Sequence, residues 1–528
     1  MNTDSKKDAV PVSLVLRDGY LEVRGDCGGL RDKLRYYRKE IGREGYDRKV
    51  VTTHEDLFDE SNDEQGELLV TMPGFAHKVL EYFRSNGIPW RFMDARTPMP
   101  APNYARAFHG LRPYQVPLVG TMLKSGGGIL SAGTGTGKTA VSAAVIRAYD
   151  RAELCSRGTP LCVFACPDRD INRKNWEEFH RWLPDRNIGL IMSGARNVQS
   201  DDVVCCTIDS LDHIDPDSVG ILIVDEMHTS ASRTRSERIA MFRKARKWGV
   251  SATPTGRFDG ADAVSEGLYG PVVATFSYQD GVKSGALVPI TVLWLPAPPP
   301  VCGLSTYAKF KKRDAKIRHG STINDDFAMA VAEIFNCTPK DTQILGVMQF
   351  IEQMQHVSKF CSGTGCVHAE TNPAKLASFP NVSAIKPSDR KRIYDAFRTG
   401  ELTSMLSTMV WSTGVDFPGL SVVVNIGGGG SDIVAKQIPG RASRKSDGKD
   451  HAYIVDFVHK WDREDPEGRS GRPGPLLSND FARRRAYKSL GFEQVSCNRI
   501  SELPFVDQEK AGASRLASSI LDPGTTLL

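Results

Sequence analysis

The sequence predicts an α/β fold with two tandem parallel-sheet lobes, a small α+β N-terminal domain and a short helical C-terminal tail. From about residue 110, apolar strand-like runs alternate with helical segments, as in "GGGIL", "LCVFACP", "DVVCCTID", "GILIVDE" and "KWGVSAT". A second alternating block spans about 330 to 460, with "TQILGVM", "TSMLSTM", "LSVVVNIG" and "HAYIVDF". Short β-rich runs separated by helices are typical of a parallel sheet. Two such blocks therefore predict two similar lobes.

The N-terminal domain is expected at residues 1–105, as an accessory nucleic-acid-binding domain. "GGLRDKLRYYRKEIG" (28–42) is basic and helix-like, and "EDLFDESNDEQGE" is acidic and is expected to be a loop. "GFAHKVLEYFRSNGI" has helical apolar spacing with a glycine stop, and "DARTPMPAPN" is typical of a linker. The basic stretch suits either a contact with nucleic acid or a solvated helix face.

The remaining boundaries follow from changes in composition. The first lobe is expected at 106–298 and the second at 330–462. Between them lies a basic linker, 299–329, whose "YAKFKKRDAKIRHG" is expected to be helical. The tail, 463–528, begins with the turn-rich "EDPEGRSGRPGP" and continues with the basic "NDFARRRAYKSLGF".

The composition is that of an ordinary globular protein. The chain has 528 residues, of which 40% are hydrophobic and 25% charged, and its net charge is +5. That charge permits a nucleic-acid partner without indicating one. The polar start, "MNTDSKKDAV", lacks the apolar core of a secretory signal, and prolines interrupt the most apolar stretch, "ALVPITVLWLPAPPPV". We expect a cytoplasmic protein without a membrane partner.

The 11 cysteines include no CxxC pair, which favours reduced thiols over a disulfide framework. The densest group is "CSGTGCVH", with Cys361, Cys366 and His368. Its spacing leaves a metal site open, although no fourth ligand is evident and Cys337 is distant in the sequence.

The segment "SAGTGTGKTA" (131–140) has the context of a phosphate-binding loop. An apolar strand precedes it, and the helix-forming "AVSAAVIRAYD" follows it. Glycines let backbone N–H groups face an anion, and a helix N-terminus adds a favourable dipole. Lys138 would reach the β- and γ-phosphates, and Thr139 would hold Mg²⁺. Ala132 stands where the strict pattern has glycine. The alternative is a glycine-rich turn with a solvated lysine. The loop residues expected to bind nucleotide are Gly133, Thr134, Gly135, Thr136, Gly137, Lys138 and Thr139.

The run "GILIVDEMH" supplies the acidic groups that such a loop requires. Its apolar strand delivers Asp225 and Glu226 at the carboxyl end, where ligands lie in parallel sheets. Asp225 is suited to hold Mg²⁺, and Glu226 to orient and deprotonate the attacking water. His228 is expected to couple the site to the other lobe. The alternative is a solvated pair of carboxylates at a strand end.

The stretch "GVSATPTGR" follows another apolar strand. Ser251 and Thr253 are small hydroxyl residues that could hydrogen-bond the acidic pair and report its state. A turn beginning at Pro254 explains the pattern equally well.

Six motifs occur in an order that resembles superfamily 2 DExH helicases. They are "LRPYQ", "AGTGTGKT", "VDEMH", "SAT", "STGVDFPGL" (412–420) and "QIPGRASR" (437–444), within about 105–460. The resemblance implies two RecA-like lobes of a P-loop NTPase that uses ATP and Mg²⁺. It also implies that Gln115, with Arg112 nearby, reads the adenine.

The resemblance assigns further residues to hydrolysis and coupling. Arg441 and Arg444 would be arginine fingers, with Gln437 near the γ-phosphate; a basic helix end is the alternative. Gly414 and Asp416 would couple the nucleotide to nucleic acid, and many relatives carry glutamate where this chain has Thr413. Contacts with the nucleic-acid backbone are implied for Pro167, Asp168, Arg169, Thr207 and Thr408.

Within the superfamily, the chain is most similar to the UvsW/XPB-like branch, which includes phage-encoded members. "LVTMPGFAHKVLEYFRSNGIPWRFMDAR", "SYQDGVKSGALVPITV" and "NDFARRRAYKSLGF" carry this looser likeness. It implies an ATP-dependent helicase or translocase that unwinds or remodels duplex or branched DNA in recombination, repair or replication. We expect a monomer that grips the phosphate backbone and works beside replication or recombination proteins. An RNA helicase, or an ATPase that serves as a switch subunit of a larger complex, stays open.

Overall fold

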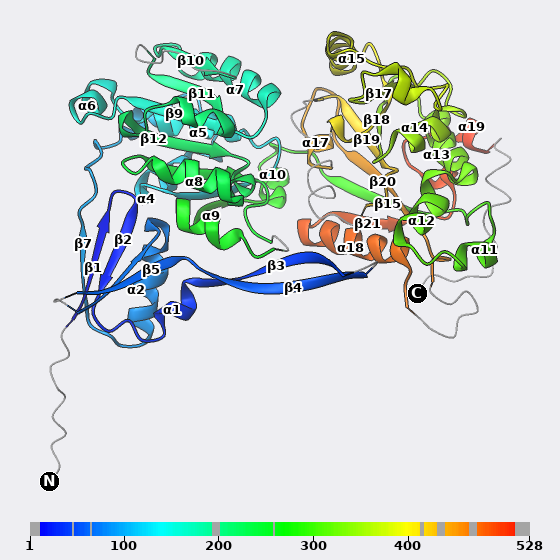
Figure 1. Ribbon diagram of the computed structural model, residues 1–528. Helices are drawn as coiled ribbons and strands as arrows, with labels where there is room; N and C mark the ends of the chain where they lie inside the picture. Colours follow the sequence, from blue (N-terminus) through cyan, green and yellow to red (C-terminus); the bar gives the residue numbers. More distant parts are fainter. Residues whose placement is uncertain are drawn as a thin grey trace. The chain divides into compact units, whose positions relative to one another are not determined.

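The computed structural model describes residues 11–44, 47–63, 66–192, 201–256, 259–411, 417–429, 439–463 and 472–512. The chain divides into two compact units. The first comprises residues 1–133 and 137–276, and the second comprises residues 134–136 and 277–528. Each unit contains its own seven-stranded sheet, and the first also carries a smaller N-terminal sheet (Figure 1).

The N-terminal sheet has five strands in the order β5-β6-β2-β1-β7. Alternation along β1 buries Val12, Leu14 and Leu16 against the helix α2. The predicted helix in "GFAHKVLEYFRSNGI" is confirmed as α2. The elements are β1 Val12–Arg17, β2 Tyr20–Arg24, α1 Leu30–Lys33, β5 Phe58–Asp63, β6 Gly66–Thr71, α2 Ala76–Ser85 and β7 Trp90–Asp94.

Two predictions for this domain are wrong. In the basic stretch 28–42 only α1 is helical, and β3 (Arg35–Glu44) pairs with β4 (Asp47–Asp56) as a long antiparallel hairpin (Figure 1). Cross-strand partners explain the difference, because Arg35 donates to Asp56 and Tyr36 to Glu55. The acidic stretch forms β5 and the start of β6 instead of a loop.

The N-terminal domain contacts the helix α9 (Asp262–Tyr269) of the same unit. Lys78 Nζ lies 2.5 Å and His77 Nε2 lies 2.9 Å from the Glu266 carboxylate. At Gly74 an added β-carbon would lie 2.1 Å from the Glu266 carbonyl oxygen, so only glycine fits this approach. The hairpin of β3 and β4 has its own contact with the loop before α9, where the Lys39 N–H donates to the Asp259 carbonyl.

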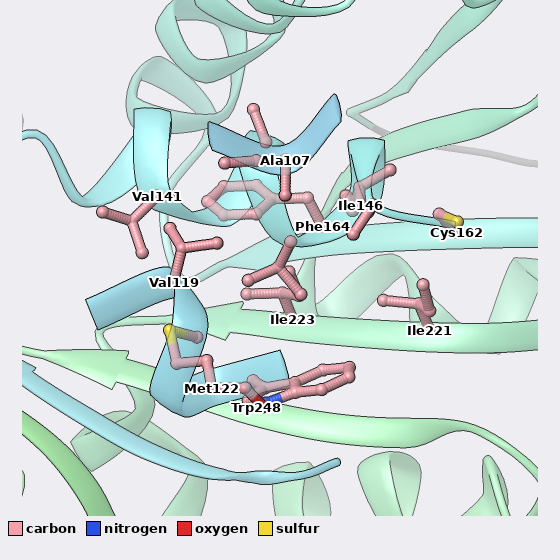
Figure 2. Close-up of a cluster of buried hydrophobic side chains, with 14 of the residues drawn as sticks. Ala107, Val119, Met122, Val141, Ile146, Cys162, Phe164, Ile221, Ile223 and Trp248 are labelled. Carbon is pink, nitrogen blue, oxygen red and sulfur yellow. The ribbon is translucent and has the colours of Figure 1, made fainter. Parts of the chain in front are cut away.

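The first large sheet is entirely parallel, in the order β10-β11-β9-β12-β13-β8-β14. Helices cover both faces, so its strands are apolar on both sides. Along β12, Ile221 and Ile223 join one core with Phe164 and Trp248, shown in Figure 2, and Leu222 faces another. The strands are β8 Gly128–Ala132, β9 Leu161–Cys166, β10 Ile188–Ile191, β11 Val203–Thr207, β12 Val219–Asp225, β13 Arg246–Ser251 and β14 Val272–Phe276. The other helices of this unit are α3 Tyr104–Phe108, α4 Gln115–Ser125, α5 Lys138–Arg147, α6 Arg151–Ser156, α7 Arg169–Trp182 and α8 Arg233–Met241.

The second large sheet is also parallel, in the order β17-β18-β16-β19-β20-β15-β21. Two such sheets confirm the predicted fold class. The strands are β15 Ile290–Pro296, β16 Gln343–Val347, β17 Gly365–Val367, β18 Ser404–Ser407, β19 Leu420–Asn425, β20 Ala452–Val458 and β21 Glu493–Ser496. The helices are α10 Tyr278–Lys283, α11 Leu304–Ala308, α12 Arg313–Ile317, α13 Asp325–Cys337, α14 Ile351–Ser358, α15 Pro387–Thr399, α17 Pro439–Ala442, α18 Pro475–Leu490 and α19 Gln508–Gly512.

The structure moves the predicted boundaries of both lobes. The first unit ends at Phe276 instead of residue 298, because β15 pairs with β20 and β21 in the second sheet. The expected linker 299–329 contains α11 and α12 as short helices. The expected tail from 463 is no appendage, because α18 and β21 belong to the second lobe.

A buried network ties α18 to the second sheet. The Arg483 guanidinium donates to both Asp456 carboxylate oxygens at 2.9 Å and to Asp480 at 2.8 Å. Its Nη1 donates to the Gly428 carbonyl at 2.8 Å. Arg483 is 1% exposed, and these carboxylates raise its pKa against the effect of burial.

Two further features concern metals and membranes. In the described part of the chain, no three His, Cys, Asp or Glu residues are placed to hold a metal ion. Of the open candidates Cys361, Cys366 and His368, both cysteines are free and His368 Nε2 contacts the Ser383 carbonyl. No helix within the described ranges is both long and apolar enough to span a membrane.

Candidate nucleotide and nucleic-acid sites

The phosphate-loop segment joins β8 to α5, as its sequence predicts. Gly137 caps α5 with φ 79°, and Gly135 has φ 84°, a left-handed region that favours glycine. A β-carbon on Gly137 would lie 2.4 Å from Gln115 Nε2. The loop therefore depends on glycine for both its backbone and its close packing, and α5 begins at Lys138 directly after it.

The order of strands brings the predicted catalytic groups together. Lys138 follows β8, Asp225 ends β12, and Ser251 ends β13, which lies between those strands. Since the strands are parallel, their carboxyl ends share one edge of the sheet. Lys138 Nζ lies 4.0 Å from Glu226 Oε1. This distance places the loop lysine beside the acidic pair.

Asp225 and Glu226 have different environments although they are adjacent. Asp225 is buried, and its Oδ1 accepts a hydrogen bond from the Glu226 N–H at 3.0 Å. Burial, followed by the charge of Glu226, raises the pKa of Asp225 to about 6, and Lys138 acts in the opposite direction. The Glu226 side chain keeps 23% of its surface exposed. Glu226 is therefore the carboxylate that solvent water can reach more easily.

Glu226 has φ 47°, and among the described residues it is the one non-glycine residue with positive φ. Such a conformation costs about 1–3 kcal/mol for an ordinary residue. In this conformation Glu226 Oε2 lies 3.4 Å from both Ser251 Oγ and His228 Nδ1. His228 Nδ1 also lies 3.0 Å from Ser251 Oγ, and the Thr253 N–H donates to that hydroxyl at 3.1 Å. The structure thus gathers three of the four predicted coupling residues, His228, Ser251 and Thr253, around Glu226.

Thr139 and Asp225 offer a hydroxyl and a carboxylate oxygen, the hard donors that Mg²⁺ prefers. The residues therefore fit the predicted metal ion. The Thr139 hydroxyl donates a hydrogen bond of 3.1 Å to Oδ1 of Asn175, a residue of the helix α7. Sequence reasoning missed Asn175, because nothing in "NRKNWEEF" distinguishes a buried asparagine from its polar neighbours.

The predicted adenine-side residues lie at the start of α4. Gln115 is buried, and its Oε1 accepts a hydrogen bond from the Arg112 N–H at 3.0 Å. Tyr114 stacks on Phe276 with ring centroids 4.6 Å apart, and its hydroxyl accepts from the Arg112 guanidinium at 3.4 Å. Tyr114 and Phe276 were not assigned to this site from the sequence. The tyrosine could have been found, because it stands next to Gln115 in "LRPYQ".

Four of the five predicted nucleic-acid residues line one hollow of about 660 Å³ in the first unit. Pro167, Asp168 and Arg169 follow β9, and Thr207 ends the neighbouring strand β11. Sequence reasoning missed the other lining residues, which are Asp170, Met192, Asp209, Ser210 and His213.

The charges around this hollow are largely engaged within the protein. Asp168 caps α7 by accepting from the Asp170 and Ile171 N–H groups. Asp209 accepts from Arg235, which holds the pKa of that carboxyl below its usual value. The hollow is thus lined by hydroxyls, Arg169 and compensated carboxylates instead of a row of lysines.

The second unit holds the remaining predictions. Thr408 follows β18, and its N–H donates to the Val367 carbonyl at 3.1 Å. Arg444 forms an isolated antiparallel bridge with Leu287. Arg441 lies on α17, and its side chain is outside the described structure. Gly414, Asp416 and Gln437 lie outside the described residues altogether.

Two family models match the chain. Residues 108–256 match the model described as "Type III restriction enzyme, res subunit". Residues 327–446 match the model described as "Helicase conserved C-terminal domain". The first match includes the phosphate loop and the acidic pair, and the second includes the Gln437–Arg444 segment.

Curated relatives match at low identity. The DNA 3'-5' translocase XPB2 of Sulfurisphaera tokodaii is 25% identical over 374 residues, which cover 66% of this chain and 82% of the relative. The DNA 3'-5' helicase XPB of Kineococcus radiotolerans is 22% identical over 387 residues, 71% of this chain and 64% of the relative. The chain spans about half the length of two further relatives, 43% of one and 50% of the other. Among solved structures, T4 UvsW matches 93% of this chain and 99% of its own, with 15% identity and a TM-score of 0.37.

Proposed function

We propose that this chain, a superfamily 2 helicase of the XPB/UvsW-like type, is an ATP-driven motor that unwinds or remodels duplex or branched DNA in recombination, repair or replication. The observation that supports hydrolysis most strongly is the approach of Lys138 Nζ to within 4.0 Å of Glu226. This approach joins a phosphate-binding loop to a water-activating carboxylate in one sheet.

The triphosphate of ATP would be bound by the loop amides of 133–137 and by Lys138. Thr139 and Asp225 would hold Mg²⁺, which when bound neutralises charge on the β- and γ-phosphates. Gln115 and Arg112 would orient the base from the start of α4. These assignments agree with the donor types that each position presents.

Glu226 is the better candidate for the general base. Its side chain is partly exposed, whereas Asp225 is buried and uses one oxygen for the Glu226 N–H. His228 and Ser251 lie within 3.4 Å of the Glu226 carboxylate and would hold its orientation. Because Ser251 ends β13 and accepts from the Thr253 N–H, a shift in this loop would move the base. That link supports a coupling role for His228, Ser251 and Thr253.

Charge that develops on the γ-phosphate would be stabilised by Arg441 and Arg444, with Gln437 ordering the water. Such arginines contribute about 10³–10⁵ in rate in related phosphoryl transfer. Gly414 and Asp416 would link this step to nucleic-acid binding. These roles rest on the match of 327–446 to a helicase C-terminal domain.

DNA is the proposed track, because the relatives that match most of this chain are named as DNA 3'-5' helicases or translocases. We accordingly propose movement in the 3'-5' direction. The hollow lined by Arg169 and Thr207, together with Thr408, would contact the phosphate backbone without reading sequence.

Two substitutions test the hydrolytic site. Lys138→Ala should abolish DNA-stimulated ATP hydrolysis, because the triphosphate loses its only loop cation. Glu226→Gln should still bind ATP and DNA but hydrolyse about 10²–10⁴-fold more slowly, as expected for a lost general base. Steady-state hydrolysis and fluorescent-nucleotide binding measure the two effects. Lys124→Ala, on α4, serves as the control. Wild-type turnover in Lys138→Ala would refute the phosphate loop.

A further inference from the structure

Lys449 is a buried lysine that the proposed mechanism does not use. It is 7% exposed and lies in the loop between Arg444 and β20. Its Nζ donates to the Leu420 carbonyl at 2.6 Å and to the Pro418 carbonyl at 3.1 Å. Within the described residues no Asp or Glu forms an ion pair with it. Its bonding partners are thus two backbone carbonyls of a single turn.

That turn is the exit of the "STGVDFPGL" motif. Pro418 follows directly after Phe417, which is fully buried, and Leu420 begins β19. The turn is tightly packed, because a β-carbon at Gly419 would lie 2.4 Å from Gln343 Oε1. A side chain that holds this turn therefore holds the entry to β19, which follows Gly414 and Asp416 in the sequence.

The backbone of Lys449 lies in the loop that follows the "QIPGRASR" motif. Arg444 bridges Leu287, and the adjacent Ser443 carbonyl accepts from the Val288 N–H at 2.7 Å. Within the following loop, the Lys449 N–H donates to the Ser446 carbonyl at 3.1 Å. Burial, and then the charge of Arg444, lowers the pKa of Lys449 to about 7, in keeping with this closeness. Lys449 thus joins the loop that follows Arg444 to the turn that precedes β19.

Burying the Lys449 amine costs free energy of desolvation, which an apolar side chain at the same position would avoid. A buried amine requires hydrogen bonds, whereas methionine would occupy a similar volume without that requirement. The two bonds to carbonyls are also directional, so they fix the distance between the loop and the turn in a way that apolar packing does not.

We propose that Lys449 is a positioning residue that fixes the exit of the Gly414 and Asp416 segment against the exit of the Arg441 and Arg444 segment. It thereby transmits nucleic-acid binding at the first segment to the arginines of the second. This inference rests on the proposed function, because those arginines are assigned to hydrolysis there.

Lys449→Met tests the proposal against Lys445→Met, an exposed lysine in the same loop. ATP hydrolysis is measured without DNA and with saturating forked DNA, and thermal unfolding is followed in parallel. Lys449→Met should lower the stimulated kcat about ten-fold, within the range of typical coupling between sites, and leave the basal rate and the KM for ATP unchanged. Lys445→Met should keep the wild-type ratio of stimulated to basal rate.

A wild-type ratio in Lys449→Met would overturn the proposal, and so would an equal loss of basal and stimulated rates, which a purely structural lysine predicts. If Lys449→Met fails to fold, Lys449→Arg tests the proposal instead, because its guanidinium can still donate to the Pro418 and Leu420 carbonyls. A ratio near that of the wild type is expected for this folded variant, and complete loss of stimulation would refute the link. Absence of DNA-stimulated hydrolysis in the wild-type chain would instead refute the proposed function and this inference with it.

Discussion

At the scale of single residues, the acidic pair shows what the sequence could and could not predict. The apolar run in "GILIVDEMH" predicted that Asp225 and Glu226 lie at the carboxyl end of a strand, and β12 does end at Asp225, with Glu226 directly after it. It could not predict the left-handed φ of Glu226, because a backbone angle at a non-glycine residue depends on the packing around it. Asn175 was missed for a similar reason, since its bond to Thr139 joins two helices that are distant in sequence.

The raised pKa of Asp225 predicts how the stability of the folded chain depends on pH. Its folded pKa, about 6, lies above the ordinary value of 3.8, so between these values the folded state binds more protons than the unfolded state. The contribution of Asp225 to the free energy of unfolding therefore decreases as pH rises through this window and is constant above it.

Asp225→Asn should remove this contribution. Compared with the variant, the wild-type chain should lose more stability between pH 4 and pH 6, as measured by urea unfolding at several pH values without nucleotide or Mg²⁺. Identical pH profiles for the two proteins would show that Asp225 is not desolvated in the folded chain.

At the scale of elements, buried strands were predictable and exposed ones were not. Runs such as "LCVFACP" are apolar throughout, because helices cover both faces of the sheet, and they stand out without any knowledge of their partners. The hairpin of β3 and β4 was taken for a helix, because its stability comes from cross-strand pairs such as Arg35 with Asp56. Pairing of this kind is not visible in a single segment.

The helix α18 provides a test at this scale, because it carries a buried and an exposed arginine two residues apart. Arg483→Met should lower the free energy of unfolding by about 3–5 kcal/mol, since it leaves the Asp456 and Asp480 carboxylates buried without their cation. Arg485→Met should change stability by less than about 0.5 kcal/mol, as is usual at an exposed position. Chemical unfolding of the full chain measures both.

Equal stability of the two variants would show that the network does not hold α18 to the sheet. The chain can also unfold in two steps, one for each unit. Arg483→Met should then shift only the step in which the second unit unfolds, because Arg483 lies wholly in that unit.

At the scale of the whole molecule, the two-lobe architecture was predicted and its boundaries were not. Two alternating blocks gave two parallel sheets, as expected. The strand β15 ends at Pro296, well before the second block begins near residue 330, and still inserts between β20 and β21, so its lobe could not be assigned from local sequence. The same holds for α18 and β21, which lie after a turn-rich stretch and nevertheless complete the second lobe.

The two units and their motifs together support a motor in which ATP hydrolysis at the Lys138 and Glu226 site drives movement on DNA. The most direct measurement is strand displacement from a forked DNA with one fluorescent strand, with duplex DNA, single-stranded DNA and an RNA fork as comparisons. We expect ATP-dependent displacement on forked DNA, absent in Lys138→Ala, together with hydrolysis that DNA stimulates more than RNA does. Hydrolysis stimulated equally by DNA and RNA, or stimulated by DNA without any displacement, would rule out a DNA motor driven by this site.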